Sequence, residues 1–248
     1  MLHVVYEDDR LLVADKPADL VCHPTKGDET SSLIGRVRLH LGSREGRLVN
    51  RLDRETSGLV AVAKDSEAAR ELARLFESGA VTKTYLALVH GTLRDERLVD
   101  APLGRDEASE VAIKDRVRPD GATASTVVRP IRPVRVGDRS CTLVEAEPRT
   151  GRKHQIRIHL EHIGHPVVGD KLYGPDEQIY LRLVRGEMTT ADREALVVPT
   201  HALHAWRLAF RWRERDWRFE APAPVLLRAL AEQCLPERGL RPERSHYC

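Results

Sequence analysis

The chain contains short apolar segments, some with the character of a strand and others with apolar side chains at helical spacing. They follow one another without a regular order, and this restricts the fold more than any other feature. Residues 4–6 and 11–14 have strand character and lie on either side of an acidic turn. Residues 33–41 and 66–77 instead carry apolar side chains at helical spacing. A continuous apolar run at 59–63 is typical of a buried strand. Because strands and helices do not alternate strictly, we expect an α+β fold with a mixed or antiparallel sheet.

Hydroxyl side chains mark the expected beginnings of the helices. Ser31 or Ser32 is a candidate N-cap for the first helix and Ser66 for the second. Thr150 is the candidate cap of a third helix over residues 153–163.

The other expected elements are strands at 85–89, 123–128 and 141–147, a hairpin of 210–212 with 217–219, and a final helix at 223–235. Two charged stretches, 105–121 and 182–198, have no sustained apolar period, so we expect them to be surface insertions. Residues 237–248 are expected to form a mobile C-terminal tail.

Composition excludes several classes of protein. With 41% apolar and 31% charged residues in 248, the chain is typical of a globular protein, neither disordered nor membrane-spanning. The first residues lack a basic and then apolar signal segment, so we expect a cytoplasmic protein. Four scattered cysteines without a C-x-x-C pair argue against a zinc site and a disulfide framework.

The basic residues are clustered although the formal net charge is only +2. Arginines recur six times over residues 36–54, and a second basic group occupies 149–157. Such clusters are often solvated faces, but they are also what contact with nucleic-acid phosphates requires. Composition leaves both interpretations open.

The polar segment 50–58 runs directly into the apolar strand and contains Asp53 between Arg51 and Arg54. Neighbouring positive charge holds a carboxylate ionised, which suits a nucleophile or a general base. The alternative is an ordinary loop aspartate that accepts hydrogen bonds from the local backbone.

A second informative segment is 150–160, in which Arg157 lies between apolar isoleucines on the expected helix. A partly buried arginine needs a carboxylate partner. Two candidates are Glu161, one helical turn away, and Asp53, far away in sequence. The histidines at 154, 159, 162 and 165 are spaced irregularly for one helix face, so we expect no metal site. The nucleotide-binding glycine motifs are also absent.

Several segments together resemble the RluA-type pseudouridine synthase family. Residues 50–59 read Asn-Arg-Leu-Asp-Arg-Glu-Thr-Ser-Gly-Leu and match the family's H-R-L-D-x-x-T-S-G-L except at the first position. Residues 150–160 match T-G-R-x-H-Q-I-R-x-H-L completely. The further similarities are, in chain order, residues 6–17, residues 83–87 (K-x-Y-L-A), residues 164–174 (G-H-P-[IV]-x-G-D-x-x-Y-G) and residues 203–205.

The resemblance implies a mixed, largely antiparallel bent sheet with flanking helices, and two subdomains around a central cleft. It implies an isomerase that flips a uridine of ribosomal or transfer RNA out of the stack and converts it to pseudouridine. Asp53 is then the catalytic aspartate, Arg157 its ion-pair partner, and Tyr85 lies against the flipped base. Arg51 enters the RNA stack where that base leaves. The expected RNA contacts are Arg51, Arg54, Lys83, Arg152, His154 and Gln155.

Residues 1–236 are expected to form the catalytic domain, without the separate S4-type domain of some relatives. The resemblance implies no cofactor or metal, an RNA partner and a monomer. Asn50 departs from the family histidine, and we interpret position 50 as structural. Two rival hypotheses are a hydrolase of the glycosidic bond, which would need a metal or second carboxylate, and an RNA-binding protein without activity.

Overall fold

The protein is described by a computed structural model that covers residues 2–24, 29–225 and 227–228. Its strands are β1 (His3–Glu7), β2 (Leu11–Lys16), β3 (Arg47–Leu48), β4 (Ser57–Ala63), β5 (Val81–His90), β6 (Arg97–Asp100), β7 (Leu103–Arg105), β8 (Asp115–Val117), β9 (Ser125–Val136), β10 (Arg139–Pro148), β11 (Leu203–Trp212) and β12 (Arg215–Glu220). Its helices are a 3-10 turn at Glu29–Ser31, α1 (Leu33–Leu41), α2 (Ser66–Glu77), α3 (Gln155–His162), α4 (Gln178–Arg185) and α5 (Thr190–Leu196).

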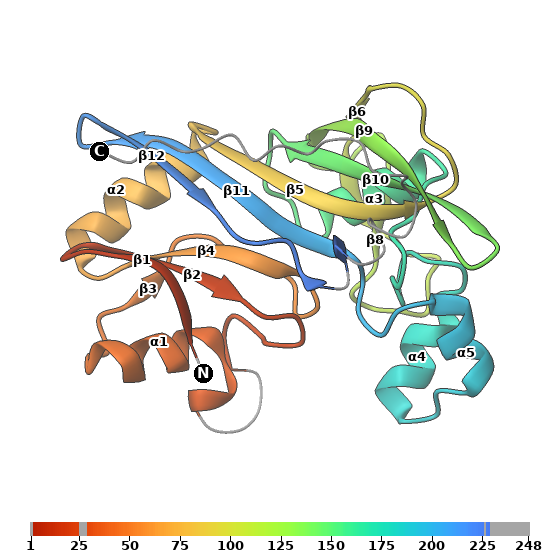
Figure 1. The fold of residues 1–248 in the computed structure, drawn as a ribbon, viewed down its shortest axis with the longest axis horizontal. Helices are drawn as coiled ribbons and strands as arrows, with labels where there is room; N and C mark the ends of the chain where they lie inside the picture. Colours follow the sequence, from red (N-terminus) through yellow and green to blue (C-terminus); the bar gives the residue numbers. More distant parts are fainter. Residues whose placement is uncertain (1, 25–28, 226, 229–248) are drawn as a thin grey trace.

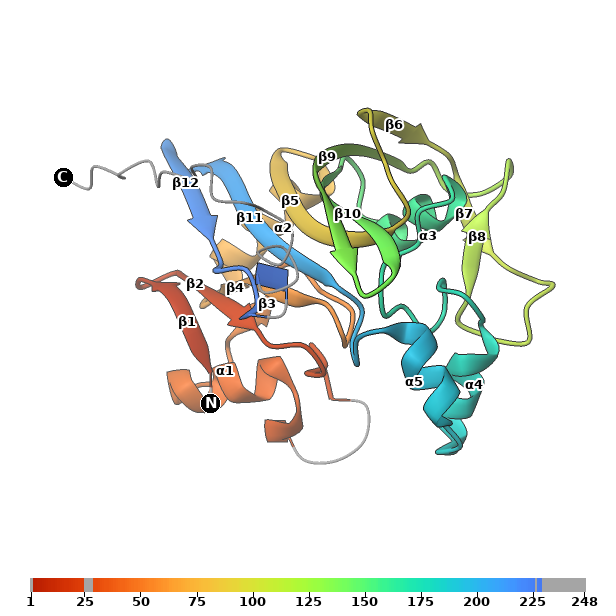
Figure 2. The ribbon, with the colours of Figure 1, turned by 45° about the vertical axis from the view of Figure 1, so that its right-hand side comes forward.

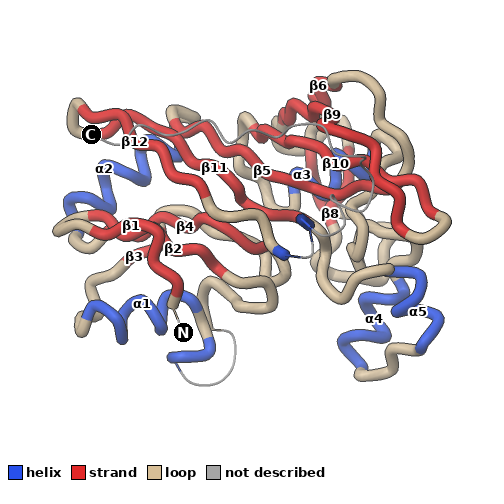
Figure 3. The backbone as a smooth tube through the Cα atoms, in the orientation of Figure 1, coloured by secondary structure: helices blue, strands red, loops and turns tan. Residues whose placement is uncertain are grey.

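Ten of these strands form one sheet that runs through the whole molecule (Figure 3). The order along it is β1-β2-β4-β11-β5-β10-β9-β6, with β3 beside β4 and β12 beside β11. Among the described strands the neighbours are antiparallel, except that β4 and β11 are parallel. The expected α+β class with a mixed, largely antiparallel sheet is confirmed.

Helices α1 and α2 cover opposite faces of the N-terminal part of this sheet (Figure 1). The reason is the alternation of side chains along β2 and β4, which sends successive apolar residues to opposite sides. On the α1 side the buried residues are Leu12, Ala14, Val60 and Val62 with Leu33 and Val37. On the α2 side they are Leu11, Val13, Leu59 and Ala61 with Ala68 and Leu72.

The parallel contact between β4 and β11 is short and joins the two parts of the sheet. It pairs Ser57 with His204 and Gly58 with Ala205. Gly58 has φ +108°, and a Cβ there would lie 2.2 Å from the carbonyl oxygen of Ala205. Only glycine therefore permits this approach of the two strands. The polar segment 50–58 is held at this junction because it leads directly into β4.

The expected first helix and both expected hairpins are confirmed, but two helix caps were assigned wrongly. Ser32 caps α1, whereas α2 is capped by Asp65 rather than Ser66, because the Asp65 carboxylate accepts the backbone N–H groups of residues 67 and 68. Helix α3 begins at Gln155 and not at 153. Thr150 does not cap it, because its hydroxyl donates to the Gln155 side chain at 2.6 Å.

The two stretches expected to be surface insertions contain regular structure. The first includes β8 and the buried Val111, and the second includes the end of α4 and all of α5 (Figures 1 and 2). A capping box between Thr189 and Asp192 begins α5, and Arg182 of α4 donates to the same Asp192 carboxylate. Helix α5 depends on this polar cap and ion pair rather than on a long apolar period, so periodicity did not reveal it.

The expected final helix is present at residues 225 and 227–228, and the rest of it lies outside the described residues, as does the expected tail 237–248. Among the described helices, none is long and apolar enough to cross a membrane.

Candidate active site

A pocket of about 1090 Å³ lies between the segment 48–53 and the segment 148–157. Strand β5 contributes Lys83 and Tyr85 to its wall, and the end of α2 contributes Phe76. The expected site residues that line it are Arg51, Asp53, Lys83, Tyr85, Arg152, His154, Gln155 and Arg157. Arg54 does not line the pocket, and its exposed side chain donates to the carbonyl of Asp19.

Asp53 lies in a loop whose backbone and side chains are fixed from several directions. The loop closes on itself through the N–H of Thr56 and the carbonyl of Asp53, at 3.2 Å. The other bonds join Lys16 Nζ to the Arg54 carbonyl (3.0 Å), Lys171 Nζ to Glu55 (2.7 Å) and His201 Nε2 to Thr56 Oγ1 (2.7 Å). The Asp53 carboxylate is thereby held in place while 28% of its side chain stays exposed to the pocket.

Arg157 is the ion-pair partner of Asp53. Its Nη1 donates to Asp53 Oδ2 at 2.9 Å, and only 8% of its side chain is exposed. The other side of the guanidinium meets Asp170, with Nε–Oδ2 at 2.6 Å and Nη2–Oδ1 at 2.9 Å. Asp170 is completely buried and also accepts the backbone N–H groups of Leu172 and Tyr173. Arg157 thus points at these two carboxylates and not at Glu161.

The charges of the site decide the protonation state of Asp53. Burial by itself raises the pKa of a carboxyl group, but the positive charge of Arg157 outweighs it, and the pKa of Asp53 lies below its ordinary value. Asp53 is therefore ionised at neutral pH. For Tyr85, burial and the nearby charge of Asp53 both raise the pKa, so that its hydroxyl keeps its proton. Burial lowers the pKa of His154 to about 4, which leaves the ring neutral.

The basic residues of the pocket differ in how free they are. Arg51 and Arg152 are exposed, and Nε of Arg152 donates to the carbonyl of Thr123 at 3.0 Å. Lys83 is half-buried and donates to the carbonyl of Thr150 at 3.2 Å. Gln155 is almost completely buried, and its amide bonds to Thr150, Arg152, Ser125 and Thr126 occupy it inside the protein.

Asn50 uses its side chain to hold β4. Its Nδ2 donates to the carbonyl of Leu59 at 3.3 Å, and its Oδ1 accepts the N–H of Ala61 at 2.8 Å. Both bonds are to the backbone of the strand that follows the Asp53 loop. This arrangement agrees with the interpretation of position 50 as structural.

Four residues of the site were not singled out from the sequence: Thr56, Asp170, Tyr173 and His201. Asp170 and Tyr173 belong to the segment 164–174, whose pattern is readable, but nothing local indicates that Asp170 faces Arg157. The one available signal was the need of a buried arginine for more than one acceptor. In the described part of the chain no group of three His, Cys, Asp or Glu side chains is placed to hold a metal ion.

The chain is similar to known proteins over most of its length. The sequence pattern of the family described as RNA pseudouridylate synthase matches residues 10–162. The chain belongs to this family. It is 38% identical over 218 residues to the ribosomal large subunit pseudouridine synthase D of Nitrosomonas europaea, covering 84% of this chain and 57% of that protein. It is also 38% identical over 229 residues to the protein of the same name from Xanthomonas campestris, covering 90% of this chain and 66% of that protein. The chain therefore spans less than two thirds of both relatives.

The fold of this family member also matches a solved structure. Human RNA Pseudouridylate Synthase Domain Containing 1 superposes with a TM-score of 0.72 at 23% identity, and the match covers 96% of this chain and 97% of the human one. At this identity the likeness concerns the fold. It supports the arrangement of the sheet and of the helices around the pocket.

Proposed function

We propose that this protein is an RNA pseudouridine synthase that isomerises a uridine of ribosomal or transfer RNA. The observation that carries the proposal is the ionised Asp53 on the wall of a large pocket, held by Arg157 and reached past exposed arginines. Family membership points to the same chemistry.

The reaction breaks the bond between C1′ and N1, rotates the uracil and joins its C5 to C1′. Asp53 supplies the ionised carboxylate, whether it attacks C1′, adds to the ring or removes the 2′ proton. Arg157 keeps this carboxylate charged in a pocket that the bound nucleotide closes to water. Tyr85 lies against the extruded base. Its raised pKa favours a role in stacking over one as a base that starts from the phenolate.

A uridine within an RNA helix must leave the stack first, and this costs a few kcal/mol. Arg51 is exposed at the pocket rim, and Arg152 lies on the facing segment, so the two can contact the RNA from both sides of the opening. Lys83 adds a further positive charge on the wall. Contacts to phosphates and stacking on an aromatic ring are the interactions that offset base extrusion.

A hydrolase of the glycosidic bond would need a group that activates water, such as a second carboxylate near the first. Asp170 is a second carboxylate, but it is completely buried behind Arg157 and accepts from four N–H donors, two of the Arg157 guanidinium and two of the backbone. It has no access to water in the pocket. An isomerase is therefore favoured over a hydrolase.

The test is incubation of the protein with ribosomal and transfer RNA transcripts labelled with tritium at C5 of uridine. A synthase releases tritium and leaves the RNA chain intact, a hydrolase leaves abasic sites, and a binding protein does neither. Large-subunit ribosomal RNA is the first substrate to test, because two relatives are named for it. The expected monomeric state and cytoplasmic location stay predictions.

A further inference from the structure

A chain of hydrogen bonds reaches the pocket from behind His154. The backbone N–H of Asp115 donates to the hydroxyl of Tyr173 at 3.2 Å. The same hydroxyl lies 3.0 Å from Nδ1 of His154. The other ring nitrogen, Nε2, faces the pocket and lies 3.9 Å from Oδ1 of Asp53, which is beyond hydrogen-bond distance.

The directions of these hydrogen bonds decide which nitrogen of His154 carries the hydrogen. The Tyr173 hydroxyl oxygen accepts the backbone N–H of Asp115. The hydroxyl hydrogen needs an acceptor of its own, because only 2% of Tyr173 is exposed. Within the described residues the acceptor at hydrogen-bond distance is His154 Nδ1. The reverse direction would leave a buried O–H unpaired, which is unfavourable. Nδ1 is therefore an acceptor, and in a neutral ring the hydrogen is on Nε2.

The groups around His154 keep its imidazole neutral and fix the orientation of the ring. Asp53 and Asp170 favour the charged ring, whereas burial and the cations Arg157 and Lys153 oppose it more strongly. The ring packs edge-on against Tyr173, with centroids 5.6 Å apart, and the Arg157 guanidinium lies over that tyrosine.

The backbone of His154 is also unusual. It has φ +55°, in the left-handed region that non-glycine residues seldom adopt. Such strain persists where the surrounding structure over-determines a conformation, and it is frequent at functional sites. Here it sets the imidazole at the pocket wall immediately before α3 begins.

We propose that His154 is a neutral hydrogen-bond donor of fixed tautomer, that its Nε2–H binds a carbonyl oxygen of the base in the pocket, and that Tyr173 is the positioning residue that sets the tautomer. This inference rests on the proposed function, because it takes uracil as the base. A neutral donor fits beside Asp53, because it can bind a carbonyl without giving the carboxylate a proton. His154 then orients the base and does not act as an acid.

The tautomer is tested without reference to activity, by NMR of the full chain labelled with ¹⁵N-histidine. His154→Gln identifies the signal. We expect a single neutral Nε2–H form from about pH 5.5 to about pH 8, well above the pKa of about 4. Tyr173→Phe keeps the ring contact and removes the hydroxyl, and we expect it to produce a mixture of tautomers. An Nδ1–H or doubly protonated ring in the parent protein overturns the inference and leaves the proposed function intact.

The contact to the base is tested by turnover. Loss of one donor to a substrate carbonyl should lower kcat/KM of His154→Leu about ten- to a hundredfold, and His154→Gln, which keeps an N–H, should recover most of it. Transcripts with 2-thiouridine or 4-thiouridine replace one carbonyl oxygen by a poorer acceptor. One of the two thiouridine transcripts should lower the turnover of the parent protein but leave the turnover of His154→Leu unchanged. If both sulfur substitutions affect parent and variant equally, His154 does not bind the base, whatever the state of its tautomer.

Discussion

Asp53 and Arg157 lie 104 positions apart in the chain, yet Nη1 of the arginine donates to Oδ2 of the aspartate at 2.9 Å. The same guanidinium is held on its other edge by Asp170, which is fully buried. One cation therefore serves two carboxylates, of which only Asp53 has part of its side chain exposed to the pocket. This relationship keeps Asp53 ionised.

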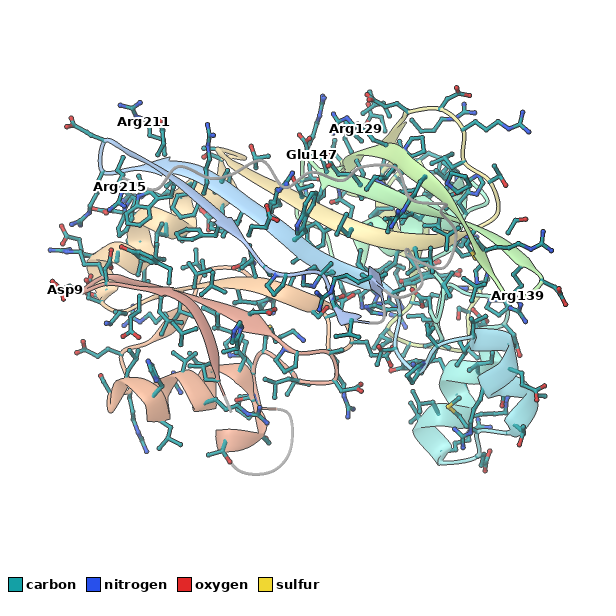
Figure 4. The ribbon with its side chains drawn as sticks, in the orientation of Figure 1. Asp9, Arg129, Arg139, Glu147, Arg211 and Arg215 are labelled. Carbon is teal, nitrogen blue, oxygen red and sulfur yellow. The ribbon has the colours of Figure 1, made fainter. Side chains whose placement is uncertain are left out.

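Asp53→Asn should lower turnover about a thousandfold or more, because an amide is neither a nucleophile nor a base. Folding should change little, since Arg157 keeps its two bonds to Asp170. RNA binding should persist, because phosphate contacts do not involve this side chain. Tritium release, urea denaturation and filter binding measure the three quantities. The matched control is Asp9→Asn in the exposed β1–β2 turn (Figure 4), and tritium release from Asp53→Asn at the control's rate would refute the assignment.

Arg157→Ala should cost both stability and activity. It leaves Asp53 and the buried Asp170 without their cation, and an uncompensated buried charge is destabilising by roughly 3–5 kcal/mol. Adding Asp170→Asn to this variant should recover part of the free energy of unfolding without recovering turnover. Arg211→Ala, on an exposed part of β11 (Figure 4), is the control for loss of an arginine. Equal stabilities of Arg157→Ala and the control would contradict the buried pair.

Tyr85→Phe keeps an aromatic face and loses the hydroxyl. Because the raised pKa of Tyr85 disfavours the phenolate, we expect this variant to keep its RNA affinity and most of its turnover. Tyr85→Ala removes the stacking surface and should weaken binding by about 1–3 kcal/mol, which is the usual size of base–aromatic stacking. Single-turnover rates and affinities separate the two effects. A large fall in the single-turnover rate of Tyr85→Phe, at unchanged affinity for RNA, would instead assign proton transfer to the hydroxyl.

Asn50→His should be active, with a dependence of rate on pH like that of the parent protein. The asparagine side chain bonds to the backbone of β4 on both its amide atoms, and a neutral imidazole can replace part of this bonding. Asn50→Ala should lower the free energy of unfolding by about 1–3 kcal/mol, because the Ala61 N–H loses its acceptor. A large gain in rate for the histidine variant, with a new titration near pH 6.5, would show that position 50 moves protons.

The buried His201 should make stability depend on pH in the acid range. Burial, assisted by the charge of Arg157, lowers its pKa to about 3, whereas an unfolded histidine has a pKa of about 6.5. Between these values the unfolded chain binds more protons than the folded one, so the free energy of unfolding falls as the pH is lowered.

His201→Gln removes this titration. It should flatten the slope by up to about 1.4 kcal/mol per pH unit when urea denaturation is compared from about pH 6.5 to about pH 4.5. His154 still titrates in the variant, so a smaller slope should remain. His162→Gln, at an exposed position of α3, is the control. Identical slopes in the two variants would mean that His201 is not held neutral in the folded protein.

Local patterns in the sequence predicted much of the fold and part of the site. The apolar runs of β2 and β4, the helical spacing of α1 and α2, and the two hairpins all depend on side chains within a few positions of one another. The flanking arginines and the motif match singled out Asp53, and the burial of Arg157 between isoleucines indicated that it needs a carboxylate. These features are readable because periodicity and local charge act over short stretches of chain.

The partners of these residues could not be read from local patterns, because they come from distant parts of the chain. Whether Arg157 pairs with Glu161 or with Asp53 and Asp170 depends on the order of strands in the sheet, which brings residues 53, 157 and 170 together. The same holds for the relay from Asp115 through Tyr173 to His154, and for the β4–β11 junction at Gly58. The chemical groups available at the site were already readable from the sequence. The partners were decided by contacts between distant segments, because burial leaves each charged or polar group to find its acceptor in three dimensions rather than along the chain.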